Sequence, residues 1–389
     1  MSLKETFSAC DLHWMERALQ LAKRGLGKTS PNPMVGAVLV KGDAVIGEGW
    51  HRRAGEPHAE IEAIRAAEFK GHRPYGATLY VTLEPCCTFG RTPPCTDAIQ
   101  RAGIRRVVVA AIDPNPKHSG KGLRHLERAG IRISQGMLAD RADRLNEAFN
   151  YWIVHRQPLV TVKAAMTLDG KIATVSGESK WITGRPARAW AMKLRNTVDA
   201  VLVGINTVLA DDPRLTVRGL EPKTGNPAQT PTAQAKGAGL RRIILDTKAR
   251  TPLMARVVTD EFAALTTIVV GNQAPRARVA ELKRKANVIR APARNGKIDL
   301  QWLLRWLSSQ NVTHLLVEGG GEVNASFFES GLVQRVAFLY APKIVCGASA
   351  PKAVAGTGAR TQQEMLQLKD VKWRRLGVDL LLTARVASP

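Results

Sequence analysis

Apolar residues in the first half of the chain switch repeatedly between helical and strand-like spacing. Leu12, Met15 and Leu19 recur at helical intervals after Asp11, which predicts a helix with Asp11 as its cap. Segments 34–40 and 44–49 predict two strands joined by a hairpin turn. The other predicted elements of this half are helices at 58–67, 97–102 and 123–129 and strands at 78–83, 107–112 and 131–134. This alternation predicts an α/β fold with a mostly parallel or mixed sheet covered on both faces.

The alternation continues through the second half of the chain. The predicted strands are 159–166, 200–204, 242–246, 267–271, 314–317 and 336–340, and the predicted helices are 183–197, capped by Thr183, 300–307 and 322–329. Segment 151–158 predicts a linker, so we expect two domains, residues 1–156 and 157–389. Segment 221–239 is rich in Pro, Gly, Thr, Gln and Ala, and predicts a mobile surface insertion.

Composition narrows the class of protein. Hydrophobic residues make up 44% of the 389 residues and charged residues 23%, as in ordinary globular proteins. The first residues lack the pattern of a secretory signal, and no apolar run approaches the roughly 20 residues of a membrane helix. We therefore expect a cytoplasmic protein with no membrane partner. The five cysteines are an odd number, and three of them cluster at Cys86, Cys87 and Cys95, which favours a metal site over disulfides.

The formal net charge of +24 makes nucleic acid an obvious candidate ligand. The charge is unevenly distributed, however. Residues 1–157 carry 23 Lys+Arg against 16 Asp+Glu (+7), and the rest carries 34 against 17 (+17). Because the cysteine cluster lies in the less basic half, we expect small phosphorylated ligands and no nucleic acid.

His58, Glu60, Cys86 and Cys95 follow the order of the zinc site in nucleobase deaminases. One imidazole and two thiolates are good zinc ligands, and a fourth position stays open for a reactive water. Glu60 is then the proton carrier and not a ligand. The neighbouring Cys87 should point away in an extended segment, and we interpret it as structural.

The predicted elements explain how these ligands can converge. Cys86 leaves a strand end, and His58 and Glu60 lie in the first turn of a predicted helix. Pro93-Pro94 favours an extended approach, after which Cys95 opens another helix. Backbone N–H groups at that helix start should favour the Cys95 thiolate and lower its pKa.

Three segments around this motif carry a resemblance to a known family. They are Ser30-Pro31-Asn32-Pro33-Met34-Val35-Gly36, Gly90-Arg91-Thr92-Pro93-Pro94-Cys95 and Asp113-Pro114-Asn115-Pro116. Eight residues separate Cys86 from Cys95, where most zinc nucleobase deaminases have two. The first half closely resembles the deaminase half of the bifunctional riboflavin-biosynthesis enzymes, which implies a cytidine-deaminase-like three-layer domain. The resemblance implies substrate contacts from Asn32, His51 and Arg91. Thr88 and Phe89 stand where the family usually has histidines.

Motifs at 167–171, 177–183 and 209–218, together with Gly319-Gly320-Gly321, resemble the reductase half of the same family. This resemblance implies a dihydrofolate-reductase-like domain that uses NADPH. The implied NADPH contacts are Ala165, Trp181, Thr207, Asp211, Thr247, Gly320, Gly321, Glu322, Val323, Asn324, Ala325 and Ser326. The implied substrate contacts are Lys163, Ser179, Arg195, Leu215, Arg218 and Glu318. By residue type, Arg195 and Arg218 suit bidentate binding of a sugar phosphate, and Glu318 suits hydroxyl or amino donors.

The hypothesis is a bifunctional enzyme that forms a homo-oligomer. The first domain, with Zn²⁺, would deaminate a diaminopyrimidinone ribosyl phosphate, and the second, with NADPH, would reduce the ribosyl side chain to ribityl phosphate. One alternative is a polynucleotide deaminase with a basic RNA-binding second half, which predicts salt-sensitive affinity and no NADPH binding. Another is a non-catalytic RNA-binding or scaffolding protein with a structural zinc, which gives Glu60 no role and needs a fourth ligand such as Cys87.

Overall fold

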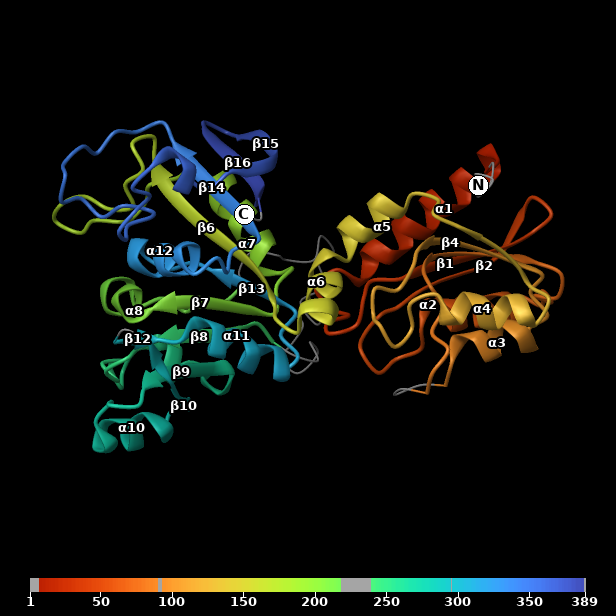
Figure 1. Cartoon of the computed structure of the whole chain (residues 1–389), viewed down its shortest axis with the longest axis horizontal. Helices are drawn as coiled ribbons and strands as arrows, with labels where there is room; N and C mark the ends of the chain where they lie inside the picture. The colour runs from red at the N-terminus through yellow and green to blue at the C-terminus, as the bar shows by residue number, and fades with distance from the viewer. Residues whose placement is uncertain (1–6, 90–92, 218–238, 295, 388–389) are drawn as a thin grey trace, which may run out of the picture. The chain divides into compact units, whose positions relative to one another are not determined.

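The computed structural model describes residues 7–89, 93–217, 239–294 and 296–387. The chain divides into two compact units, Met1–Arg156 and Gln157–Pro389 (Figure 1). This boundary falls within the segment interpreted as a linker, most of which is helical, since α6 covers Glu147–His155. The expected surface insertion at 221–239 lies outside the described residues except for its last residue.

The first unit is built on a five-stranded mixed sheet in the order β2-β1-β3-β4-β5. Its strands are β1 (Gly36–Lys41), β2 (Ala44–Trp50), β3 (Thr78–Leu83), β4 (Arg106–Ala111) and β5 (Arg132–Gln135). The β1 strand pairs antiparallel with β2 and β3, whereas β3, β4 and β5 run parallel. The mixed sheet agrees with the prediction.

Helices cover both faces of this sheet (Figure 1). They are α1 (Ala9–Ala22), α2 (Ala59–Phe69), α3 (Cys95–Arg101), α4 (Lys121–Arg128), α5 (Ala139–Leu145) and α6, with a 3₁₀ turn at Lys23–Gly25. Gly36 lies against the backbone of α1, and Gly49 lies against that of α2. These glycines occupy consecutive register positions, so they face opposite sides of the sheet. A Cβ atom at either position would strike helix backbone, which is why both helices can approach closely.

The second unit contains a nine-stranded sheet in the order β10-β9-β8-β7-β13-β6-β14-β16-β15. Its strands are β6 (Leu159–Thr167), β7 (Ala200–Gly204), β8 (Arg241–Leu245), β9 (Thr266–Gly271), β10 (Asn287–Ala291), β13 (His314–Val317), β14 (Arg335–Ala341), β15 (Leu368–Leu376) and β16 (Asp379–Val386). All neighbours pair in parallel except β14 with β16 and β15 with β16. A separate two-stranded ribbon joins β11 (Ala293–Arg294) and β12 (Lys297–Ile298).

Buried apolar strands form the centre of this unit. Ala200 and Leu202 of β7 pack into one core cluster, while Val201 and Val203 pack into another, so both faces of the strand are covered. The covering helices are α7 (Arg185–Arg195), α8 (Ile205–Asp211), α9 (Arg256–Thr259), α10 (Arg276–Lys283), α11 (Leu300–Ser309) and α12 (Gly321–Glu329), with 3₁₀ turns at Ala263–Leu265 and Gln362–Glu364. No helix of the described residues is long and apolar enough to cross a membrane.

Three predicted helix starts need correction. Ser8 caps α1 and Asp11 is its third residue, where the two form a reciprocal capping box. Gly184 occupies the cap position of α7 in place of Thr183. His58 occupies the cap position of α2 and does not lie in its first turn.

Asp11 ties α1 to the sheet. Its carboxylate accepts hydrogen bonds from the Tyr80 hydroxyl and the Arg106 guanidinium, both at 2.8 Å, and from the Ser8 backbone at 3.0 Å. Burial opposes ionisation of Asp11, but the hydrogen bonds from Arg106, Ser8 and Tyr80 outweigh it and lower the pKa to about 2. A carboxyl whose pKa is lower in the folded state stabilises the fold above its unfolded pKa near 4 and loses that contribution as the pH falls towards 2.

We predict that Asp11→Asn lowers the free energy of unfolding of the first unit by about 2 kcal/mol at pH 7. The variant should also lose the part of the acid sensitivity that wild type shows between about pH 4 and 2, because no carboxyl is left to titrate. Calorimetry of the full chain as a function of pH measures both effects. Asp43→Asn, at an exposed position of the same unit, is the control. A D11N variant as stable as D43N would contradict the role given to Asp11.

Candidate functional sites

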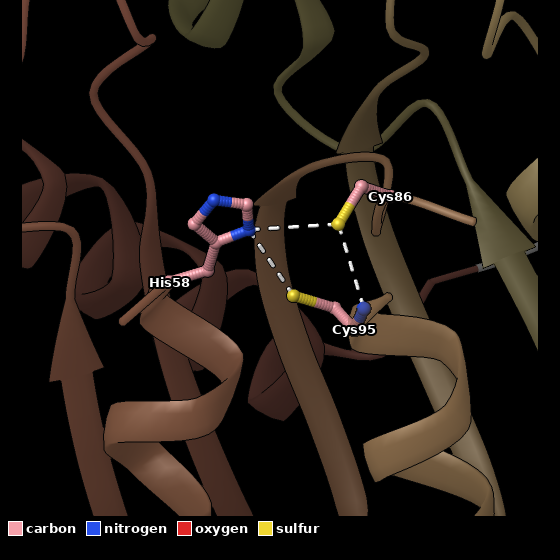
Figure 2. Close-up of side chains that lie close together, drawn as sticks. All are labelled: His58, Cys86 and Cys95. Carbon is pink, nitrogen blue, oxygen red and sulfur yellow. Dashed lines mark hydrogen bonds between the residues drawn. The ribbon is translucent and has the colours of Figure 1, made fainter. Parts of the chain in front are cut away.

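His58, Cys86 and Cys95 converge in the first unit (Figure 2). The His58 Nδ1 atom lies 3.2 Å from the Cys95 Sγ and 3.5 Å from the Cys86 Sγ. The three potential ligand atoms all lie within 4.8 Å of one another, and no other such group of His, Cys, Asp or Glu occurs among the described residues. One nitrogen and two sulfurs fit zinc and leave a fourth tetrahedral position for a water. Cys87 is not part of the cluster, as predicted.

The start of α3 shapes the site around Cys86. The Cys95 backbone N–H donates to the Cys86 Sγ at 3.4 Å, and the Thr96 N–H donates to the Cys86 carbonyl at 3.2 Å. Hydrogen bonds from Cys95 and His58 lower the pKa of Cys86 to about 4. The pKa of Cys95 is raised, chiefly because its thiol is hydrogen-bonded to Cys86 and buried. The pKa of Cys95 is therefore not lowered by the helix start as expected, since the Cys95 N–H donates to the other sulfur.

Glu60 lies two residues after His58 and is only 3% exposed. Its Oε2 atom is buried and has no hydrogen-bond partner among the described residues. Burial raises the pKa of Glu60, so this carboxyl takes up a proton more readily than an exposed one. An unpartnered carboxylate oxygen beside a three-ligand cluster is suited to exchanging protons with a water or substrate bound there.

Asn32 and His51 lie beside the same cluster. The His51 ring is 5.3 Å from the His58 ring between centroids. His51 Nδ1 faces the Pro57 carbonyl at 3.1 Å, and Nε2 faces the Asn32 amide nitrogen at 3.1 Å. Because a carbonyl only accepts, Nδ1 carries the proton and Nε2 accepts from Asn32. Burial lowers the pKa of His51, which agrees with a neutral ring. Arg91 lies outside the described residues; Thr88 and Phe89 are exposed.

Two buried side chains that sequence reasoning missed hold the loops around the cluster. Glu84, two residues before Cys86, accepts backbone hydrogen bonds from Asp113, Gly120 and Gly122 at 3.2, 2.8 and 2.9 Å. In the sequence, the position of Glu84 directly before Pro85-Cys86 could have indicated that it belongs to the site. Asn146 bonds the Met34 N–H and carbonyl at 2.7 and 2.9 Å, across 112 residues of sequence. No local pattern marks that contact.

A second candidate site surrounds Glu318, which directly follows β13. Arg195, the last residue of α7, pairs with both Glu318 oxygens, with Nε at 2.6 Å and Nη2 at 2.9 Å. The Lys163 Nζ of β6 lies 3.6 Å from Glu318 Oε2. Burial disfavours the charged carboxylate, but the positive charges of Arg195 and Lys163 outweigh this and lower the pKa of Glu318 to about 2. Glu318 is therefore an ionised, largely buried acceptor between two cations.

Arg195, predicted to bind a sugar phosphate, also has contacts within the protein. Its Nη1 also donates to the Thr216 carbonyl at 3.2 Å, so three of its five N–H groups are engaged within the protein. Arg218 lies outside the described residues. The Leu215 side chain is 3% exposed and belongs to a core cluster, which leaves only its backbone for a ligand.

The predicted cofactor residues lie mostly after the carboxyl ends of parallel strands. Thr207 follows β7, Thr247 follows β8, and Gly320 precedes the first turn of α12 after β13. A Cβ atom at Gly320 would meet nothing within 4 Å, so this helix start has room for a ligand. The N–H groups of the first turn of α12 can bind a phosphate, which fits a dinucleotide cofactor, whereas the Asn324 N–H already donates to the Gly320 carbonyl at 3.1 Å. Asn324 and Ala325 are buried, and Ser326 bonds the Glu322 carbonyl at 2.8 Å.

Some residues that the resemblance assigns to the cofactor lie next to residues that it assigns to the substrate. The Ser179 hydroxyl, assigned to substrate, donates to Asp211 Oδ1 at 2.9 Å, although Asp211 was assigned to cofactor. Trp181 is 65% exposed, and the Arg188 guanidinium lies 4.5 Å from its ring centroid. Ala165 lies two positions after Lys163 on β6 and therefore on the same sheet face.

Comparison with known proteins finds one matching family model for each of the two units that carry the candidate sites. Residues 8–111 match the family model of the cytidine and deoxycytidylate deaminase zinc-binding region, and residues 158–382 match that of the RibD C-terminal domain. The chain is 43% identical over 372 residues to riboflavin biosynthesis protein RibD of Aquifex aeolicus, which covers 96% of this chain and 97% of that protein.

Two solved structures extend the similarity over nearly the whole chain. RibD of Acinetobacter baumannii, form 1, gives a TM-score of 0.84 at 37% identity and covers 97% of this chain and 99% of that one. A diaminohydroxyphosphoribosylaminopyrimidine deaminase/5-amino-6-(5-phosphoribosylamino)uracil reductase of Thermotoga maritima gives 0.81 at 34% identity, with the same coverage.

A zinc-binding deaminase unit followed by a reductase unit defines a bifunctional enzyme. The chain belongs to the RibD family and is a deaminase and reductase of riboflavin biosynthesis. The predicted family, fold class and pair of activities are confirmed. The second half is a reductase domain, which implies a nicotinamide cofactor, and not the RNA-binding module of the alternative hypothesis.

We predict that Cys86→Ser and Cys95→Ser each lose most of their zinc, because a serine hydroxyl is a poor replacement for a thiolate ligand. Cys87→Ser, one residue from a ligand, is the matched control and should keep the zinc content of wild type. Elemental analysis of the purified, dialysed full-length proteins measures this. Equal zinc loss in C87S and C86S would contradict the ligand assignment.

Proposed function

We propose that the first unit deaminates 2,5-diamino-6-(5-phosphoribosylamino)pyrimidin-4-one and that the second reduces the product's ribosyl side chain with NADPH. The single observation that supports the first step best is the buried, unpartnered Oε2 of Glu60 beside His58, Cys86 and Cys95. The similar Thermotoga maritima protein is a pyrimidine deaminase and uracil reductase, which supports both steps.

In the proposed deamination, water adds to the amino-bearing ring carbon, the carbon–nitrogen bond breaks and ammonia leaves. His58, Cys86 and Cys95 would hold a zinc ion, which would supply the Lewis acid that makes water reactive at neutral pH. Glu60 takes the proton from this water and passes it to the departing nitrogen. Asn32 and His51, fixed to each other, orient the pyrimidine, and we assign the substrate phosphate to Arg91.

In the proposed reduction, bound NADPH would supply the hydride for C1 of the ring-opened ribosyl chain, the attached nitrogen takes up a proton, and the nitrogen–ribityl bond remains. Glu318 accepts a hydrogen bond from substrate, and the Lys163 ammonium donates one to a ribose oxygen. The pairing of Arg195 with Glu318 supports a positioning role for Arg195, and we assign the sugar phosphate to Arg218. The cofactor carries the hydride chemistry, while these residues fix the distance and the local charge.

The remaining expectations stay predictions. They are the homo-oligomeric state, the cytoplasmic location, the domain limits 1–156 and 157–389, and the individual contacts of the reductase half. Size-exclusion chromatography with light scattering measures the first of these directly.

Two carboxylate substitutions in the full chain test whether Glu60 serves only deamination and Glu318 only reduction. Glu60→Gln removes the proton carrier and should reduce ammonia release by at least about 100-fold, with zinc still bound and with reduction of the deaminated substrate unchanged. Glu318→Gln leaves Lys163 and Arg195 without their counter-charge, and should reduce NADPH oxidation by on the order of 100-fold while ammonia release stays normal.

Each variant is the control for the other, because both carry the same Glu→Gln change in one bifunctional chain. Ammonia release from the diamino substrate and NADPH oxidation with the deaminated substrate are measured separately. Normal ammonia release by E60Q would contradict the deaminase proposal. Equal loss of both activities in either variant would contradict the assignment of one carboxylate to each reaction.

A further inference from the structure

The turn after β8, residues 246–251, presents two basic side chains at the carboxyl edge of the large sheet. The turn is held firmly, since Asp246 Oδ2 accepts from both the backbone N–H and the hydroxyl of Thr251 at 2.7 Å. Ala249 and Thr251 are buried, whereas Lys248 and Arg250 are exposed. Lys248 and Arg250 therefore project from a rigid segment into solvent, directly after the candidate cofactor residue Thr247.

Arg250 links this turn to the segment after β7. Its Nη2 donates to the Asn206 Oδ1 at 2.8 Å, and Asn206 directly precedes Thr207. Arg250 therefore joins the two segments that carry Thr207 and Thr247. The Asn206 amide is neutral, so this contact fixes the guanidinium without cancelling its charge.

Other cations near this edge already have partners. Arg195 and Lys163 pair with Glu318, and Lys180 pairs with Asp211. Arg290 donates to the carbonyls of residues 271, 272 and 274. Among the described residues, neither Lys248 nor Arg250 forms an ion pair with a carboxylate. This turn therefore presents two uncompensated positive charges.

The strand order places these charges at one end of a dinucleotide-sized span. The proposed reduction uses Glu318, after β13, and Lys163, on β6, so we place the nicotinamide end of the cofactor there. The sheet order continues from β13 through β7 to β8 (Figure 1). The strands β13 and β8 are therefore two strand spacings apart, which corresponds to about 10 Å across the sheet. A cofactor with its diphosphate at the start of α12 then has its adenosine half near Thr207 and Thr247.

We propose that Lys248 and Arg250 bind the 2′-phosphate of the adenosine ribose and make the reductase half select NADPH over NADH. The inference rests on the proposed use of NADPH. The 2′-phosphate is a phosphomonoester that carries nearly two negative charges at neutral pH, and NADH lacks it. An arginine offers parallel N–H donors and a lysine offers a compact charge, so the pair suits this group in chemistry and in charge.

The test is equilibrium binding of NADP⁺ and NAD⁺ to the full-length enzyme by calorimetry. Wild type is compared with the double variant Lys248→Met/Arg250→Met, which keeps much of the aliphatic length and removes both charges. We expect the double variant to bind NADP⁺ about 100-fold more weakly, with little change for NAD⁺, because two charge-assisted contacts are lost. Arg250→Lys, which keeps the charge, should retain part of the preference for NADP⁺.

The matched control is Arg284→Met/Lys285→Met, which removes the same charges. These exposed residues lie between α10 and the start of β10, which runs parallel to β9, so they lie at the opposite edge of the sheet. The control should bind both nucleotides as wild type does. Ammonia release and the melting temperature of each variant show that the protein is folded.

The possible outcomes separate this inference from the proposal on which it rests. A wild-type enzyme that binds NADP⁺ and NAD⁺ equally would overturn the proposed use of NADPH itself. Wild-type preference for NADP⁺ that persists in the K248M/R250M variant would overturn only the assignment of these two residues. Equal weakening of both nucleotides would also overturn it, since this would indicate a structural role for the turn. Selective loss of NADP⁺ affinity supports it.

Discussion

Parallel strands end at a common edge of their sheet, and both candidate sites of this enzyme depend on that constraint. In the first unit, β3 and β4 run parallel, and Cys86 and Asp113 follow their carboxyl ends. In the second unit, Thr207, Thr247 and Glu318 follow three neighbouring parallel strands. Strands fixed by backbone pairing hold these side chains in place before substrate arrives, so little reorganisation is needed during the reaction.

Two buried glutamates illustrate how the surroundings of a carboxyl decide its role. Glu318 lies between Arg195 and Lys163, whose charges lower its pKa to about 2 despite its burial. One oxygen of Glu60 has no partner within the described part of the chain, and burial raises the pKa of this carboxyl. The same side chain is therefore a fixed anion in the reductase unit and a group ready to exchange protons in the deaminase unit.

The zinc cluster and the parallel core could be predicted because their signals are local. His58 and Glu60 are two residues apart, Cys95 directly follows two prolines, and strands such as β7 are continuous apolar runs. The hairpin of β15 and β16 was missed because eight of the nine residues of β15 are exposed, so the strand has no apolar alternation. The contacts of Asn146 with Met34 and of Arg195 with Glu318 join residues more than 100 positions apart. Such contacts arise only when the whole unit folds, and no sequence window contains them.

We infer that this one chain carries two consecutive, separable reactions. The most direct measurement follows ammonia and NADPH together in the wild-type enzyme supplied with the diamino substrate. Without NADPH, the account predicts that ammonia is released and the ribosyl chain stays unreduced. When NADPH is then added, one equivalent should be oxidised for each ammonia already released. NADPH oxidation that precedes ammonia release, or ammonia release that requires NADPH, would contradict the account.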